Sequence, residues 1–238
     1  MKLNFNLAEE FVLLGLYQSN ENFNLEFRMN KRDLCISATF LELLLDGNLD
    51  IDDRKIVRIA KRQTPRTDYI SKMLAKVCSH DWDRKIEEWS AYFKEKMDYI
   101  PATESALVDY LYESILESLI EKGAIEKVEQ QFLFIQSADY KVKQEVIDPI
   151  VKKLHTELIG EDFPSKQSIS LYFLLRKAGV LEEYLSNYNL ERFKRDLKKW
   201  TEQQPNLKQW IKWTIEAIHG EENDNDFIQD LLDLFLSS

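Results

Sequence analysis

The sequence predicts a mainly α-helical protein: a central apolar helix within a helical bundle ringed by amphipathic helices, with small winged-helix-like β-hairpins. Glycine and proline are scarce, at six and five of 238 residues, and the stretches between them repeat apolar residues at helical spacing. An apolar helical run, a glycine and a strand-like segment occur twice in that order, as LELLLDGNLDI at 41–51 and LESLIEKGAI at 116–125. Both observations favour helices that end at glycine and are covered by β-flaps.

The first elements follow from the spacing of apolar side chains. From Leu7 to Leu16 this spacing is helical. Residues 20–33 instead alternate apolar and polar side chains, which predicts a short strand or hairpin arm. Its apolar positions are Phe23, Leu25, Phe27 and Met29. Helical spacing returns over residues 35–46.

Glycines mark the expected helix ends. Gly47 and Gly123 each follow an apolar helical run and precede an apolar residue two positions on, as in helices that end with a left-handed glycine. Residues 177–181 (KAGVL) offer a third version. After the first two we expect β-structure, with FLFI at 132–135 as an extended apolar arm and QSADY at 136–140 as a tip or a return strand.

We expect the helix over residues 102–122 to be the central one. Two adjacent apolar rows at four-residue spacing make a wide apolar face: Leu107, Leu111, Ile115 and Leu119, then Val108, Tyr112, Leu116 and Ile120. A third row is acidic: Asp109, Glu113, Glu117 and Glu121. Because like charges at this spacing repel, this row forms either a solvated face or one side of a charged pocket or interface.

Further helices are expected at 81–97, 143–159, 167–178, 190–202 and 207–219. No linker rich in proline, glycine or serine divides the chain, so we expect one domain over residues 1–220. Residues 221–238 comprise an acidic stretch and a short amphipathic helix. That helix packs either on its own core or in the groove of a partner.

Composition limits the class of protein. With 31% charged residues and no apolar run of about 18 residues, no membrane-spanning helix is expected. Two cysteines, Cys35 and Cys78, make no disulfide framework and fit a reducing cytoplasm. A net charge of −10 disfavours nucleic acid as a partner. Basic residues still cluster at 52–66, which is either a flap balanced by nearby acids or a site for an anionic partner such as a lipid phosphate.

No catalytic or metal-binding pattern is recognisable in the sequence. His80, His155 and His219 lie far apart, with no second ligand at metal spacing. The chain also lacks a glycine-rich phosphate loop, a Gly-x-Ser-x-Gly elbow and a zincin motif. We therefore expect no metal, no cofactor and no enzymatic activity. The alternative is a site assembled from distant segments, which would leave no local motif.

Five segments in a fixed order carry a family resemblance: AEEFVLLGL at 8–16, FLELLLDGNLDI at 40–51, DRKIEEWSAYF at 83–93, LIEKGAI at 119–125 followed by FLF, and NLKQWIKWTIEAI at 206–218. Together they resemble the Golgi phosphoprotein 3 family over roughly residues 5–220. The resemblance implies a helix bundle that bears a β-hairpin. Eukaryotic members are non-enzymatic peripheral Golgi proteins, which bind phosphatidylinositol 4-phosphate, sort glycosyltransferases as coat adaptors and self-associate through the hairpin. Bacterial relatives exist, and the abundance of Asn, Lys, Ile and Glu favours a bacterial source.

The resemblance also implies where a lipid would bind. Counting back from the two glycines, the family's tryptophan falls at Phe27, and its three arginines fall at Ile36, Asp109 and Tyr112. The aromatic ring is retained but the guanidinium groups are not, which argues against specific phosphoinositide recognition. The lipid-headgroup candidates are Phe27, Arg28, Lys31 and Arg32. The hairpin falls at about 125–142, and its interface candidates are Phe132, Leu133, Phe134 and Ile135.

We thus expect a non-enzymatic adaptor or peripheral membrane protein of the cytoplasm, which contacts an anionic lipid headgroup or a membrane protein through a local patch. The alternative is a protein-interaction module that forms homo-oligomers through its hairpin without binding lipid. A nucleic-acid-binding winged helix is expected least, because it would need the 52–66 run and a basic helix on one face.

Overall fold

The computed structural model describes residues 4–21, 25–60, 67–78, 83–95, 107–132, 135–160, 162–186, 189, 192, 193, 196 and 205–219. This part of the chain is mostly helical with small antiparallel hairpins, which confirms the predicted fold class at that level. The helices are α1 (Leu7–Glu21), α2 (Leu25–Leu45), α3 (Asp68–Cys78), α4 (Ile86–Glu95), α5 (Leu107–Glu121), α6 (Gln144–Ile159), α7 (Lys166–Lys177), the 3-10 helix η1 (Leu181–Glu183) and α9 (Pro205–His219). The strands are β1 (Leu49–Ile51), β2 (Ile56–Ile59), β3 (Arg84–Lys85), β4 (Ile125–Phe132) and β5 (Ile135–Val142).

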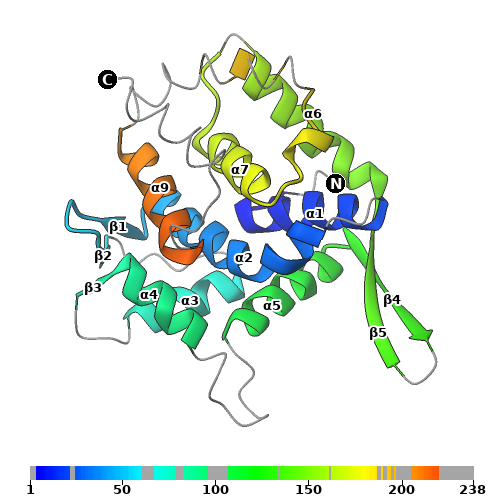
Figure 1. Cartoon of the computed structure of the whole chain (residues 1–238), viewed down its shortest axis with the longest axis horizontal. Coiled ribbons are helices and arrows are strands. Elements are labelled where there is room, and N and C mark those ends of the chain that lie inside the picture. The colour runs from blue at the N-terminus through cyan, green and yellow to red at the C-terminus, as the bar shows by residue number, and fades with distance from the viewer. Residues whose placement is uncertain are drawn as a thin grey trace.

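Helices α1 and α2 cross the middle of the molecule, with α6 and α7 on one side and α3, α4 and α5 on the other (Figure 1). α2 contacts α1, α5, α7 and α9, and α1 contacts α5, α6, α7 and β5. Every residue from Leu7 to Leu16 is buried, so α1 has no solvent-exposed face over this length. These two helices therefore hold the other elements together.

Helix α5 buries one face only, which differs from the prediction that residues 102–122 form the central helix. Its buried residues share that face: Leu111, Tyr112, Ile115, Leu116 and Leu119. Ile120 ends the second apolar row in solvent, at 39% exposure. The width of a helix's apolar face, as predicted from the sequence, does not show how many other elements pack on that helix. α2 takes the central place instead, and residues 37–39, which are small, are buried against its neighbours.

The predicted strand or hairpin arm at 20–33 is wrong, because α2 already begins at Leu25. Phe23 falls outside the described residues. The ring of Phe27 packs edge-on against Phe11, with 5.8 Å between ring centroids, and has no exposed surface. This contact between distant segments favours a helix at Phe27. The alternation of four apolar residues in the sequence could not indicate it.

The three predicted glycine stops are confirmed. Gly47, Gly123 and Gly179 all have positive φ, between 64° and 68°. In each case the next amide donates to the carbonyl five positions back, at 2.9 to 3.0 Å: Asn48 to Leu43, Ala124 to Leu119 and Val180 to Leu175. This is the Schellman geometry, which satisfies carbonyls that a helix end leaves unpaired.

Two small antiparallel sheets follow the first two glycine stops. One has the strand order β1-β2-β3, and the other is the hairpin β4–β5, paired from Ile125 with Val142 to Phe132 with Ile135. QSADY thus lies in the return strand β5, and Phe132 and Ile135 of FLFI lie in different strands rather than in one arm. Residues 133–134 lie outside the described residues.

Other predicted elements match less completely. The helices expected at 143–159, 167–178 and 207–219 are α6, α7 and α9, within two residues at each end. β3 occupies the start of the helix expected from residue 81, and α3 lies in a stretch for which no element was predicted. Most of 190–202 and all of 221–238 fall outside the described residues.

Candidate functional site

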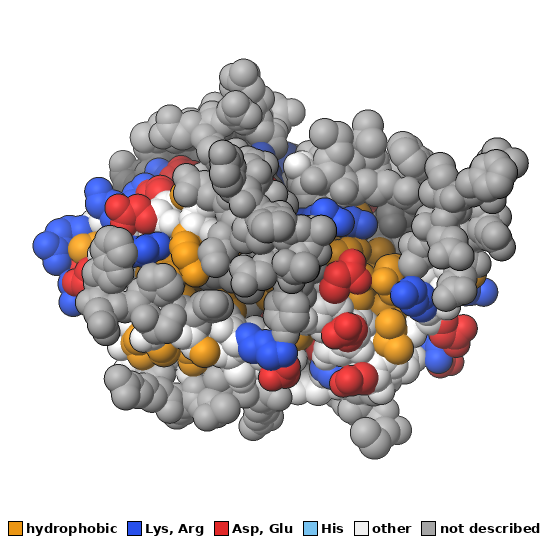
Figure 2. Space-filling view, turned by 90° about the horizontal axis from the view of Figure 1, so that it is seen from below, with side chains coloured by type: hydrophobic (Ala, Val, Ile, Leu, Met, Phe, Trp, Pro, Cys, Tyr) orange, Lys and Arg blue, Asp and Glu red, His pale blue; other side chains and the backbone are white. Residues whose placement is uncertain are grey.

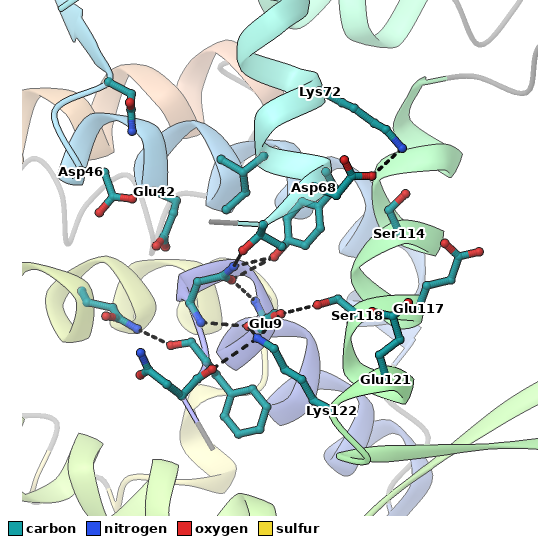
Figure 3. Close-up of a pocket in the computed structure, with 18 residues that line it drawn as sticks. Glu9, Glu42, Asp46, Asp68, Lys72, Ser114, Glu117, Ser118, Glu121 and Lys122 are labelled. Carbon is teal, nitrogen blue, oxygen red and sulfur yellow. Dashed lines mark hydrogen bonds and ion pairs between the residues drawn. The ribbon is translucent and has the colours of Figure 1, made fainter. Parts of the chain in front are cut away.

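The structure contains a cavity of about 990 Å³ with a mainly polar lining. It lies where the segment before α1, the first turn of α1, the end of α2, the start of α3 and the end of α5 meet (Figure 3). Among the described residues, its charged lining consists of six carboxylates and two lysines: Glu9, Glu42, Asp46, Asp68, Glu117, Glu121, Lys72 and Lys122. We call it the acidic pocket, because these groups carry a formal charge of −4 when all are ionised.

A reciprocal capping box at the start of α1 builds one wall. Asn6 Oδ1 accepts a hydrogen bond from the Glu9 N–H at 2.9 Å, and Glu9 Oε2 accepts one from the Asn6 N–H at 3.0 Å. This exchange satisfies two amides at the helix start. Asn6 Nδ2 also donates to the Tyr69 hydroxyl at 2.7 Å, which ties α1 to α3.

Glu9 is fully buried and its charge is compensated from α5. Lys122 Nζ lies 2.6 and 2.7 Å from the two Glu9 carboxylate oxygens, and the Ser118 hydroxyl donates to Oε1 at 2.7 Å. A buried carboxylate is tolerated only with such partners. Lys122 is therefore bound to Glu9 and does not offset the other carboxylates of the pocket.

The second lysine of the pocket is also paired. Lys72 Nζ lies 2.6 Å from Asp68 Oδ2, one helical turn earlier on α3. Both side chains are more than half exposed, so water screens this pair strongly. Neither lysine is left to neutralise the remaining acids.

Glu42 contributes a carboxyl group that is mostly buried. Its Oε2 accepts a hydrogen bond from the Leu7 N–H at 2.7 Å, at the first residue of α1. Burial raises the pKa of the Glu42 carboxyl from its ordinary 4.5 to about 7. The negative charges of Asp46, Glu10 and Glu9 raise the pKa further, whereas the Leu7 hydrogen bond opposes them.

Asn48 adds an unsatisfied acceptor to the same lining. It follows Gly47, is 3% exposed, and its Oδ1 has no hydrogen-bond partner among the described residues. A buried carbonyl oxygen without a donor is destabilising and uncommon. A pocket with excess carboxylates and an unpaired acceptor suits a ligand that is both cationic and rich in N–H groups.

The acidic row of α5 contributes to this pocket. Glu117 and Glu121 are exposed, as expected for a solvated face, and both also line the pocket, as expected for one side of a charged pocket. Glu113 is exposed outside the lining, and the Asp109 side chain lies outside the described set. Within the described ranges, no three His, Cys, Asp or Glu side chains are placed to bind one metal ion together. The carboxylates are thus spread along a surface rather than gathered around a point.

The described part of the basic run at 52–66 is balanced by acids, as we expected for a flap with acidic residues nearby. Arg54 and Arg58 lie 3.6 and 3.2 Å from Asp52, and Lys55 lies 2.6 Å from Glu87. Basic and acidic side chains accordingly stand side by side at the left end of Figure 2, where Figure 1 places β1 to β3. Residues 61–66 lie outside the described residues.

The three lipid-headgroup candidates whose side chains are described, Phe27, Lys31 and Arg32, do not line the acidic pocket. Phe27 is fully buried, and Ile36 and Tyr112 are at most 3% exposed. Lys31 Nζ lies 4.8 Å from the centre of the Tyr112 ring, and Arg32 is exposed. The Arg28 side chain is outside the described set. Phe27 therefore offers no surface to a headgroup, while a role for Lys31 and Arg32 stays a prediction.

Two of the four hairpin candidates, Phe132 and Ile135, lie at the far end of β4 and β5, which extend away from the helices (Figure 1). Phe132 and Ile135 are the last paired residues of the hairpin. Their side chains, and all of Leu133 and Phe134, lie outside the described residues. Their part in an interface stays a prediction.

Several residues of the acidic pocket were not predicted from the sequence. The capping box had a local signal, because Asn6 and Glu9 stand at the N-cap and N3 spacing before an apolar run. Glu42 had a weaker one, as a single acid inside the apolar run FLELLL. Their meeting with α5 depends on tertiary packing, which no local pattern contains.

Comparison with known proteins identifies the family of the chain. The model of the family described as Golgi phosphoprotein 3 (GPP34) matches residues 7–214, most of the chain. No curated protein matches the chain. Among the described helices, none combines the length and apolar character needed to span a bilayer.

Proposed function

Because the chain belongs to the Golgi phosphoprotein 3 family, we propose that it is a non-enzymatic adaptor that docks a cationic segment of a partner protein in the acidic pocket. The family supports the adaptor role, and the pocket supports the charge of the partner. The observation that supports this most is the charge of the lining. In the part of the chain that the structure describes, six carboxylates and two lysines line the pocket, and both lysines are already bound to carboxylates.

The dimensions of the pocket also suit a peptide segment. A cavity of about 990 Å³ is at the upper end of the range for ligand pockets, which leaves room for several side chains. Exposed Glu117 and Glu121 stand one helical turn apart, so successive basic residues of an extended segment could each meet a carboxylate.

We favour a basic segment next to the membrane span of a membrane protein as the partner. Cytoplasmic segments beside membrane spans carry an excess of lysine and arginine. The adaptor would then work in the cytoplasm at a membrane surface, in the peripheral manner that the family suggests. Long-range attraction between the acidic pocket and such a segment would speed association, and salt would weaken it.

A peptide titration tests this function. We expect a fluorescent peptide rich in lysine and arginine to bind at low salt, and the same peptide with glutamine at every basic position not to bind. Glu117→Gln combined with Glu121→Gln should weaken binding about tenfold, because two attractive charges are lost. The matched control is Glu145→Gln with Glu183→Gln, which removes two exposed acids that do not line the pocket. Equal weakening by both pairs would contradict docking in the pocket.

We further propose that the protein contacts lipid. Lys31 and Arg32 support this contact, because they are adjacent basic residues on α2 and Arg32 is exposed. Lys31 lies over the ring of Tyr112, beside positions that match the family's lipid pocket. Flotation with vesicles of graded anionic lipid content tests it. We expect weak binding that needs anionic lipid and is lost when Lys31 and Arg32 are both changed to glutamate. Absence of binding to every vesicle would exclude the lipid role.

Self-association through the hairpin is a second candidate function. β4 and β5 pair only with each other in the described chain and extend beyond the helices, so their outer edges are open to another strand (Figure 1). Size-exclusion chromatography of wild type against a Phe132→Asp, Phe134→Asp variant tests it. An oligomer that persists in the variant would rule out this interface.

A further inference from the structure

Among the described residues, no cation in the acidic pocket is paired with Glu42. Lys122 is held by Glu9 at 2.6 Å, and Lys72 is held by Asp68 at 2.6 Å. Among the described residues, the polar partner of Glu42 is a single backbone amide, the Leu7 N–H. Within the described part of the chain, an ionised Glu42 carboxylate has no counter-charge until a cation enters the pocket.

The charged and titratable groups around Glu42 are mostly acidic. They are Glu9 and Glu10 on α1, Asp46 just after α2, Asp68, Tyr69 and Lys72 on α3, Glu117 and Glu121 on α5, Lys122 just after α5, and Lys153 on α6, which is bound to Glu10. Figure 3 shows Glu42 and Asp46 side by side at one end of the pocket. Burial and this negative surround favour the protonated carboxyl in the empty pocket.

We propose that a proton and the cationic partner segment compete for Glu42, so that docking releases a proton near neutral pH. The inference rests on the proposed docking function and adds its regulation. In the step itself the Glu42 carboxyl gives its proton to solvent, and the carboxylate takes the partner's ammonium or guanidinium group as its counter-charge. No other bond forms or breaks.

The sign of the pH dependence follows from linkage. Below about pH 7 Glu42 carries a proton that the cation must displace, so docking tightens as pH rises. Release of one proton gives an affinity gain close to tenfold per pH unit between about pH 5.5 and 6.5. Above about pH 7.5 the carboxyl is already ionised, and the affinity levels off.

Titration calorimetry with an oligolysine peptide tests the inference. At pH 7 the binding heat should differ between phosphate and Tris buffers by an amount that reports about half a proton released per peptide. Glu42→Gln keeps the acceptor for the Leu7 N–H, and it should abolish this release and flatten the pH profile. Glu117→Gln is the control, because it should weaken binding but keep the release.

The outcomes separate the two proposals. If the peptide binds wild type without releasing a proton, or if Glu42→Gln retains the pH profile, the competition is refuted and docking stands. If the peptide binds at no pH, docking and the competition both fail. Should Glu42→Gln not fold, the wild-type calorimetry in two buffers still decides.

Discussion

The ring of Phe27 on α2 occupies the space beside Gly15 on α1 that a side chain at position 15 would fill. Phe27 has no exposed surface and also packs against Phe11. The absence of a side chain at Gly15 is what lets the two central helices meet at this depth. The contact also explains why a residue that alternates like a strand in the sequence lies in a helix.

Gly15→Ala should destabilise the fold by about 1 to 3 kcal/mol. The added methyl group would overlap the buried ring, and overpacking of this kind outweighs the gain of up to about 1 kcal/mol in helix propensity. Urea denaturation measures the change. Phe27→Leu in the same chain should recover part of the loss, because leucine is smaller. A strictly additive double mutant would show that the two residues do not contact.

Glycine stops could be predicted from the sequence, whereas the central helix could not. A Schellman end is made of hydrogen bonds within about six residues, so Gly47 and Gly123 carry its whole signal locally. Which helix is central depends on contacts between segments far apart in the chain. Residues 37–39 have no long apolar row, yet they are buried, because α1, α7 and α9 all pack on α2.

Gly123→Ala should cost about 1 to 2 kcal/mol through the backbone alone. Gly123 has φ 68°, and a methyl group there would meet no atom within 4 Å, so no steric clash contributes. The left-handed conformation itself disfavours a side chain. Gly123→Asn should cost less, because asparagine tolerates this region. Thermal unfolding of both variants gives the comparison, and an equal loss in the two would argue against a backbone origin.

Lys122→Met should cost about 3 kcal/mol, because it leaves Glu9 buried without its cation. Lys72→Met should cost less than about 1 kcal/mol, since the Lys72–Asp68 pair is exposed. The two changes are chemically identical, so their difference in urea midpoint isolates the effect of burial. Similar losses in both would mean that Lys122 does not hold Glu9.

Only part of the candidate site could be predicted from the sequence. The acidic row on α5 was visible as a periodic pattern, and its two readings could not be separated without a neighbour. The structure supplies that neighbour: α1 and α2 bring Glu9 and Glu42 opposite Glu117 and Glu121. A cavity between four elements has no signature in any one of them.

Glu42→Gln should stabilise the protein at alkaline pH and leave its stability nearly unchanged at acidic pH. The pKa of Glu42 rises from its ordinary 4.5 to about 7 on folding, chiefly through burial, so the folded state binds more protons between these values than the unfolded state. Wild-type stability therefore contains a contribution that is present below about pH 4.5 and is lost as pH rises through about 7. At roughly 1.4 kcal/mol per pKa unit, the loss amounts to at most about 3.5 kcal/mol.

Urea denaturation at pH 4 and pH 8 measures this contribution. Glutamine keeps the hydrogen bond from the Leu7 N–H and cannot ionise, so the variant should exceed wild type by about 1 to 3 kcal/mol at pH 8 and match it at pH 4. Glu145→Gln removes an exposed acid and should show no such pH-dependent difference. A Glu42→Gln effect of equal size at both pH values would mean that Glu42 does not change its protonation between them. Docking of a cationic segment could then displace no proton from Glu42.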